Sequence, residues 1–225
     1  DDIWEPDKQK EASKVYGTED IEHPGVLQLF NTNNYYVSGK LKKINLPTHH
    51  DFTDLRHTPQ EVKENIKKMN YDSTIAFQTR NPIHRAHQEL MTRAMKELEA
   101  NILIHPTVGM TKPGDIDHYT RVNCYKKILP HFPSDSTLLS LIPLAMRMAG
   151  PREALWHALI RKNYGCTHLI VGRDHAGPGN RRNGDPFYGP YDAQELLLRH
   201  QDEINIKMVP FKLFVYVKEK NDFYE

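Results

Sequence analysis

Cysteine is scarce in this chain, whose 225 residues include only Cys124 and Cys166. Both lie in ordinary helix or strand-edge contexts, so the sequence predicts free thiols rather than a disulfide framework and favours a cytoplasmic location. Long apolar runs are also missing. No stretch approaches the ~20 apolar residues that a membrane span needs, and the first residues show no apolar core of the signal-peptide kind. We therefore expect no membrane partner.

A surplus of either charge is absent as well. Lys and Arg together number 30 and Asp and Glu 29. A nucleic-acid-binding protein usually carries a basic surplus, so the composition argues against a nucleic-acid partner and leaves room for a local anion site. Hydrophobic residues make up 38% of the chain, enough for the core of one domain, or of one domain with pieces of its neighbours.

From residue 73 onward, strand and helix patterns alternate. Such alternation predicts an α/β fold with a Rossmann-like, mostly parallel sheet and helices on both faces. Ligands of such sheets bind beyond the carboxyl ends of the strands. The expected strands are 73–78, 102–105, 137–142, 168–171 and 206–209, the expected helices are 84–99, 119–129, 151–164 and 193–201, and an apolar run follows at 211–217.

Residues 1–57 follow no such alternation. The highly charged segment 1–14 predicts a solvated arm, followed by a helix at 25–30 and strands at 35–37 and 41–46. Residues 47–58 contain several His and Asp side chains. Spacing alone does not establish a metal site, and a polar interdomain loop is the preferred interpretation. Thr58, Pro59 and Glu61 then form the cap, first position and third position of a helix start.

The stretch Gln78-Thr79-Arg80-Asn81-Pro82-Ile83-His84-Arg85-Ala86-His87 lies where a buried strand pattern ends and a helix pattern begins. Residues three apart on a helix share a face, so His84 and His87 are both expected to project from the first turn. Unpaired backbone N–H groups at a helix start favour an anion, and Arg80 adds a guanidinium. Strand, tight turn and cationic helix start together predict a phosphate site.

A second motif, Gly172-Arg173-Asp174-His175-Ala176-Gly177, follows the strand expected at 168–171. With the first motif it resembles the ATP sulfurylase (sulfate adenylyltransferase) family, most closely its fungal-type branch. Nucleotidylyltransferases of the wider superfamily usually carry His-x-Gly-His, and the alanine at position 86 is shared by the fungal-type sulfurylases. Three further runs, 111–118, 150–154 and 187–193, fit the same family, and the similarity extends from about Tyr16 to about Tyr216.

The resemblance implies adenylyl transfer from ATP to sulfate, giving adenosine 5′-phosphosulfate and pyrophosphate, the first step of sulfate assimilation. It implies that residues 1–57 are the end of a β-rich N-terminal domain plus a linker. Residues 58–225 would be the nucleotidylyltransferase catalytic domain without its C-terminal closing subdomain. Magnesium is expected to arrive with ATP, held mainly by phosphate oxygens, with no metal ligand from the protein. The chain is expected to form a homo-oligomer.

Site residues follow from the same resemblance. Sulfate would be bound by Gln78, Arg80 and the backbone N–H of Ala176, and a planar guanidinium suits a tetrahedral oxyanion because it donates two parallel hydrogen bonds. The expected catalytic residues are Thr79, Arg80, Asn81, His84, His87 and Phe211. The expected ATP-binding residues are Gln78, Thr79, Arg80, Asn81, His84, His87, Gly172, Arg173, Asp174, His175 and Phe214.

Each role has a plainer alternative. Arg80 could form a surface salt bridge, although its place directly after a buried strand argues against this. The two histidines could cap a helix or bind a metal, and Asp174 could be a local cap. The basic loop 178–184 could be a lid or a solvated loop, and the sequence does not decide between them.

Two other functions stay open. One is a nucleotidylyltransferase with a different acceptor, and the other is a nucleotide-binding fragment without catalysis.

Overall fold

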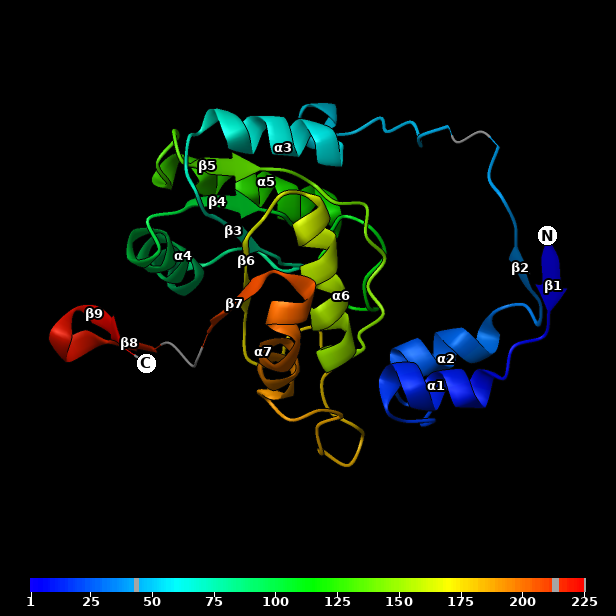
Figure 1. Cartoon of the computed structure of the whole chain (residues 1–225). Helices are drawn as coiled ribbons and strands as arrows, with labels where there is room; N and C mark the ends of the chain where they lie inside the picture. Colours follow the sequence, from blue (N-terminus) through cyan, green and yellow to red (C-terminus); the bar gives the residue numbers. More distant parts are fainter. Residues whose placement is uncertain (43–44, 212–214, 225) are drawn as a thin grey trace.

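The computed structural model describes residues 1–42, 45–211 and 215–224. Within them, a sheet of strand order β5-β4-β3-β6-β7 forms the centre of the molecule, and all of its pairings are parallel (Figure 1). This confirms the predicted fold class. The strands are β3 (Thr74–Phe77), β4 (Asn101–Ile104), β5 (Thr137–Leu139), β6 (His168–Val171) and β7 (Lys207–Pro210).

Helices cover both faces of this sheet. Successive strand residues point to opposite faces, so Ile75 packs in one apolar cluster and Ala76 in another. The first cluster includes residues of α4 (Arg85–Glu97) and α5 (His118–Ile128). The second includes residues of α3 (Pro59–Lys68), α6 (Gly150–Asn163) and α7 (Asp192–Ile204). Strands buried on both faces account for the nearly continuous apolar runs of the sequence.

The order of the strands matters for the site. β3 and β6 are neighbours, although 90 or so residues separate them along the chain (roughly three βα units). From β3 the chain continues outward to β4 and β5, and from β6 it continues in the other direction to β7. The order therefore reverses between β3 and β6, and the carboxyl ends flanking such a reversal are where open α/β sheets bind ligands.

The helix start at Thr58 is confirmed. The Thr58 hydroxyl accepts a hydrogen bond from the Glu61 N–H, and the Glu61 carboxylate accepts one from the Thr58 N–H, which is a complete capping box. The other predicted elements of the sheet domain are also found, with ends that coincide with the predicted ones or differ from them by up to three residues.

The N-terminal segment contains β1 (Asp2–Trp4), α1 (Lys8–Tyr16), α2 (Pro24–Asn31) and β2 (Tyr36–Ser38). The predicted solvated arm at 1–14 is wrong, because Asp7 caps α1 and the helix buries Ala12 and Tyr16 against α2. The predicted helix at 25–30 and strand at 35–37 are found as α2 and β2, the latter paired antiparallel with β1. No described residue of the predicted strand 41–46, that is 41–42 and 45–46, is in a strand.

Asp51 of the linker 47–58 makes one contact within the linker and one to the sheet domain. Asp51 accepts hydrogen bonds from Arg56 at 2.7 Å and from His118 of α5 at 2.8 Å. A short 3-10 turn, η1 (Thr53–Leu55), precedes α3. Two carboxylate contacts therefore fix a segment that the sequence presented as a polar loop.

The N-terminal segment is also fastened to loops of the sheet domain. His23 is fully buried, and its Nε2 lies 3.1 Å from the Met148 carbonyl oxygen and 3.0 Å from the Tyr188 hydroxyl. The basic loop after β6 is held by the same segment, since Arg181 pairs with Asp20 at 3.4 Å and Arg182 with Glu22 at 3.6 Å. If this loop moved as a lid, both ion pairs to the N-terminal segment would have to break.

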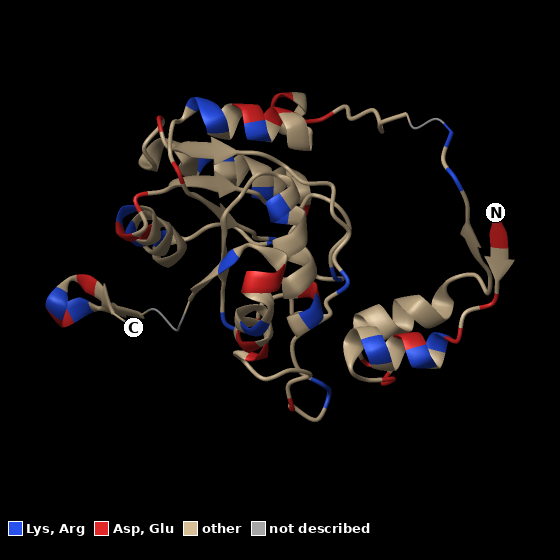
Figure 2. Ribbon diagram, viewed as in Figure 1, with Lys and Arg blue, Asp and Glu red and all other residues tan. Residues whose placement is uncertain are grey.

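The remaining described elements are η2 (Leu129–His131), β8 (Val215–Val217), η3 (Lys218–Lys220) and β9 (Asp222–Tyr224). β8 and β9 form a hairpin beside α4, where Arg93 pairs with Asp222 at 2.8 Å (Figure 1). Charges of both signs occur together on α1, α3 and α4 (Figure 2). Among the described helices, none is long and apolar enough to cross a membrane.

Candidate active site

The two sequence motifs meet at the strand-order reversal. The first follows β3 and the second follows β6, and both line a cavity of about 320 Å³. A larger cavity of about 480 Å³ adjoins it and shares four of its lining residues, Arg80, Arg173, Asp174 and His175. The second signature therefore forms the wall between two compartments, each large enough for a phosphate group or part of a nucleotide.

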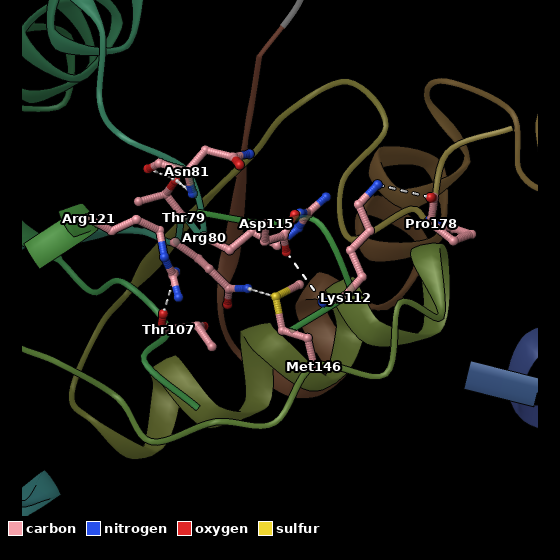
Figure 3. A network of polar contacts seen from close by, with 10 residues as sticks. Thr79, Arg80, Asn81, Thr107, Lys112, Asp115, Arg121, Met146 and Pro178 are labelled. Carbon is pink, nitrogen blue, oxygen red and sulfur yellow. Dashed lines mark hydrogen bonds and ion pairs between the residues drawn. The ribbon is translucent and has the colours of Figure 1, made fainter. Parts of the chain in front are cut away.

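The turn after β3 is closed by its own side chains. The Thr79 hydroxyl donates to the Asn81 carbonyl at 2.9 Å and accepts from the Asn81 N–H at 3.0 Å. From α5, the Tyr125 hydroxyl also donates to the Asn81 carbonyl at 2.9 Å. Figure 3 shows Thr79, Arg80 and Asn81 grouped at this turn. Thr79 and Asn81 therefore complete this turn, while their expected roles in ATP binding and catalysis stay predictions.

Arg80 forms an ion pair through Nη1 with the Asp115 carboxylate, and the two side chains are 17% and 7% exposed (Figure 3). The salt-bridge alternative, which the sequence argued against, is therefore present. The pair is not a surface one, because Arg80 lines both cavities and Asp115 is nearly buried. Asp115 also accepts a hydrogen bond from the Lys112 N–H, so its two oxygens hold the guanidinium and the 112–115 turn together.

His84 and His87 lie at the first turn of α4, as predicted, with their rings stacked at 3.8 Å. His84 is the exposed N-cap residue and makes no capping hydrogen bond. Burial, together with the neighbouring His84, lowers the pKa of His87 to about 4. The expected cationic helix start is thus wrong for His87, whose ring is neutral near pH 7. Its buried Nδ1 has no hydrogen-bond partner among the described residues.

The second signature makes a turn of unusual backbone shape. Asp174 and Ala176 both have φ of 54°, the left-handed region that side chains disfavour. Backbone hydrogen bonds hold the turn: the Asp174 N–H donates to Pro190 O at 2.8 Å, and the Gly150 N–H donates to Ala176 O at 3.1 Å. The Ala176 N–H donates to no described residue and stays available to an anion.

The remaining predicted residues are distributed as follows. Gln78, Gly172, His175 and Phe211 line the smaller cavity, and Arg173 lies 3.1 Å from Asp174 with both side chains half exposed. The Phe211 ring faces His87 at 6.3 Å. Phe214 lies outside the described residues. The structure therefore gathers the predicted set around one cavity, with Phe214 the exception that it does not describe.

Sequence reasoning missed three residues of the site. Lys112 and Met146 line the cavities, and the Lys112 Nζ donates to Pro178 O at 3.2 Å (Figure 3). Asp115 orients Arg80. Lys112 and Asp115 fall in the run 111–118, which drew attention only as part of a resemblance. Its mixture of Lys, Gly and Asp after a strand was a usable signal, whereas nothing local pointed to Met146.

Chemically, this arrangement suits anions. A guanidinium, an ammonium, a second arginine, an unpaired helix start and a free backbone N–H surround the two cavities. Of the described side chains that line them, Asp174 is the only carboxylate. Fold and site together define an α/β protein of the nucleotide-binding kind, with a polyanion site at the switch point of its sheet.

Comparisons with known proteins narrow this class. A family model described as ATP-sulfurylase matches residues 53–225, and a second, described as PUA-like domain, matches residues 1–46. The chain therefore belongs to the ATP-sulfurylase family, which confirms the resemblance seen in the two motifs. The extent of the N-terminal domain predicted at 1–57 stays a prediction.

Curated fungal proteins named sulfate adenylyltransferase are similar along nearly the whole chain. Identity is 56% with the Gibberella zeae protein and 54% with that of Yarrowia lipolytica, each over 99% of this chain, and 54% with that of Schizosaccharomyces pombe over 98%. The chain spans 39% of the first two relatives and 45% of the third.

A solved structure described as a hexameric APS kinase from Thiobacillus denitrificans is also similar. It matches with a TM-score of 0.65 and 30% identity over 80% of this chain and 32% of that one. A likeness of this extent supports the parallel-sheet architecture described above.

Proposed function

We propose that this chain carries the catalytic site of a sulfate adenylyltransferase. A sulfate oxygen attacks the α-phosphorus of ATP, the bond from that phosphorus to the pyrophosphate oxygen breaks, and adenosine 5′-phosphosulfate and pyrophosphate leave. The observation that carries the proposal is the meeting of both family motifs around one cavity at the reversal point of the sheet. The sulfate adenylyltransferase names of relatives at 50–56% identity support the same reaction.

Transfer of this kind needs in-line positioning and neutralisation of charge, and little covalent help. In the proposed arrangement, Gln78, Arg80 and the Ala176 N–H bind sulfate. Asp115 pairs with Nη1 of Arg80. The opposite edge of the guanidinium can therefore donate two parallel hydrogen bonds to the oxyanion. A fixed guanidinium loses less side-chain entropy on binding than a free one.

His84 and His87 steady the β- and γ-phosphates as pyrophosphate leaves. A neutral His87 still donates one hydrogen bond from its ring. An adjacent polyphosphate favours the charged form of an imidazole, so ATP binding raises the pKa of His87 from its low starting point and draws a proton from solvent. Arg173, Asp174 and His175 form the wall against the nucleotide, Gly172 lets its backbone approach, and Phe211 completes the wall of the smaller cavity. That Phe214 binds ATP stays a prediction.

Magnesium fits this site as a companion of ATP. Asp174 is the one carboxylate among the described residues of the cavity walls, and Mg²⁺ bound to nucleotides is held by phosphate oxygens, water and one or two carboxylates. When bound, the ion would neutralise charge on the leaving oxygens. The chain's own residues bind and orient the two anions.

The runner-up function is adenylyl transfer to a different acceptor, and a third is nucleotide binding without catalysis. The guanidinium, amide and backbone N–H that converge beside the phosphate site favour a tetrahedral oxyanion acceptor. We further propose a cytoplasmic location, from the free Cys124 and Cys166, and assembly into a homo-oligomer.

Pyrophosphate release tests the function. The full chain is incubated with ATP and magnesium alone, with sulfate, and with molybdate. Molybdate is a tetrahedral mimic whose adenylate falls apart, so turnover is expected to be continuous. Release that depends on either oxyanion supports the proposal. Release that requires another acceptor supports the runner-up, and ATP binding without release supports the non-catalytic interpretation.

A further inference from the structure

A buried polar network lies beneath the site, and two of its members, His157 and Glu153, have no role in the proposed reaction. At its centre is His157 of α6, whose side chain is fully buried. Its Nε2 lies 3.3 Å from Gln78 Nε2 and 3.3 Å from Glu153 Oε1, and its Nδ1 lies 3.1 Å from His175 Nε2. One ring thus touches a predicted sulfate ligand, a residue of the second signature and a buried carboxyl group.

The ionisation state of Glu153 decides which ring nitrogens of His157 and His175 carry a proton. Its two oxygens accept hydrogen bonds from the Arg147 and Ala149 N–H groups, each at 2.9 Å. Burial raises the pKa of Glu153, and these N–H groups oppose that rise by favouring the carboxylate. A carboxylate oxygen 3.3 Å away favours a hydrogen rather than a lone pair on His157 Nε2, and this N–H points toward Gln78. The Nδ1 of His157 is then an acceptor, and His175 Nε2 donates to it.

This proton arrangement decides how the Gln78 amide is oriented. With nitrogen against His157 Nε2–H, two donors would face each other, while Gln78 Oε1 is buried without a partner. Amide oxygen and nitrogen are assigned from such networks. If the amide oxygen and nitrogen of Gln78 are exchanged, the oxygen accepts a hydrogen bond from His157 Nε2–H. The NH₂ group then occupies the place of the oxygen that had no partner. The Gln78 side chain is thereby fixed at the wall of the smaller cavity.

We propose that His157, held by Glu153, is a positioning residue for the sulfate subsite, fixing the Gln78 amide on one side and the turn 174–176 on the other. The second half acts through His175, which lies between the two left-handed residues of that turn and whose Nε2 is 3.1 Å from His157 Nδ1. The inference rests on the proposed function. It explains why a fully buried histidine, costly to place without partners, lies under this cavity.

The test uses three variants of the full chain: His157→Ala, His157→Gln and His157→Asn. Glutamine keeps a donor near Nε2, and asparagine keeps an acceptor near Nδ1. Alanine is expected to raise the KM for sulfate by about 10- to 100-fold, the range for a lost buried hydrogen bond. The Kd for ATP, which many other residues of the two cavities also hold, is expected to rise by a clearly smaller factor. Glutamine is expected to recover most of the sulfate KM, and asparagine less. His168→Gln, at the opposite end of β6, is the matched control and keeps both constants.

A structural role alone predicts a different pattern. Equal weakening of sulfate and ATP, an unchanged sulfate KM, or no difference between the glutamine and asparagine variants would each overturn the proposal. If the alanine variant fails to fold, the two conservative variants decide. Failure of the function itself is distinguishable, because the unaltered chain would then show no sulfate-dependent pyrophosphate release.

Discussion

Replacing Arg80 with alanine should affect both the stability of the fold, through the ion pair with Asp115, and the proposed binding of sulfate. The side chain is 17% exposed and pairs with Asp115, which is 7% exposed. Removing one partner of a buried ion pair costs about 3–5 kcal/mol of unfolding free energy, because an unpaired charge stays behind. Asp115 keeps the Lys112 N–H, so we expect a loss near the lower end, about 3 kcal/mol. Loss of a charge-assisted contact in the transition state should also raise the activation free energy by at least ~2–3 kcal/mol. Sulfate-dependent turnover should therefore fall about 30-fold or more.

A double variant distinguishes the two effects. Arg80→Ala with Asp115→Asn leaves no buried charge, so most of the lost stability should return. Sulfate turnover should not return, because the guanidinium is still absent. The coupling between the two substitutions is measured as a double-mutant cycle of urea unfolding free energies.

Arg80→Lys is the matched control for geometry. A lysine ammonium can still pair with Asp115, so stability should be largely kept. It lacks the planar fork, so it should rescue little of the sulfate turnover. Near-normal sulfate turnover in the alanine variant would remove Arg80 from the sulfate site. Recovery of most of the rate by lysine would refute the two-hydrogen-bond model, and a double variant as unstable as the single one would refute the buried-charge argument.

Three further predictions follow from the site. His84→Ala and His87→Ala should each lower the turnover number more than they lower the affinity for ATP. The reason is that contacts which strengthen as charge develops on the leaving pyrophosphate act in the transition state. Bound zinc that is lost on mutation while turnover stays unchanged would show a metal site instead. The unfolded chain protonates His87 near pH 6.5 and the folded chain near 4, so stability should fall as pH drops through this window. His87→Asn should reduce this pH dependence in urea unfolding measured from pH 7 to 4, and the part that persists comes from other buried histidines with lowered pKa values. Gly150→Ala should destabilise by about 1–3 kcal/mol in thermal unfolding, since φ is +51° and its Cβ would lie 2.4 Å from the Tyr188 ring; unchanged stability would contradict this.

The sheet and the meeting of the two motifs were predictable from local patterns. Apolar strand runs and helical spacing at 90, 91, 94 and 95 gave the elements, and the rule for strand carboxyl ends placed 78–87 and 172–177 on one edge. What made this work is that buried parallel strands and amphipathic helices each leave a periodic signal of their own in the sequence.

Charge states and pairings in the site were not predictable in this way. The neutral His87 depends on burial by residues from other elements, including Phe77 of β3. Asp115 meets Arg80 across 35 positions of sequence, and no short-range pattern records such a contact. The prediction of a solvated arm at 1–14 was wrong for a different reason. The short helix found there has charged residues on its outer face and buries only two side chains, so its hydrophobic periodicity is too weak to recognise in the sequence.

The turn at 174–176 shows most clearly why a motif alone does not make a site. Neither Asp174 nor Ala176 is a glycine, and a left-handed conformation costs each about 1–2 kcal/mol. The turn persists because Pro190 O and the Gly150 N–H hold its backbone from two other segments, and because His175 bonds to His157 of α6. Gly150 in turn is pressed against Tyr188, which contacts His23 of the N-terminal segment. The conformation of the turn therefore depends on packing that reaches from His23, at the start of α2, to Pro190, just before α7. The motif forms its site only within that packing.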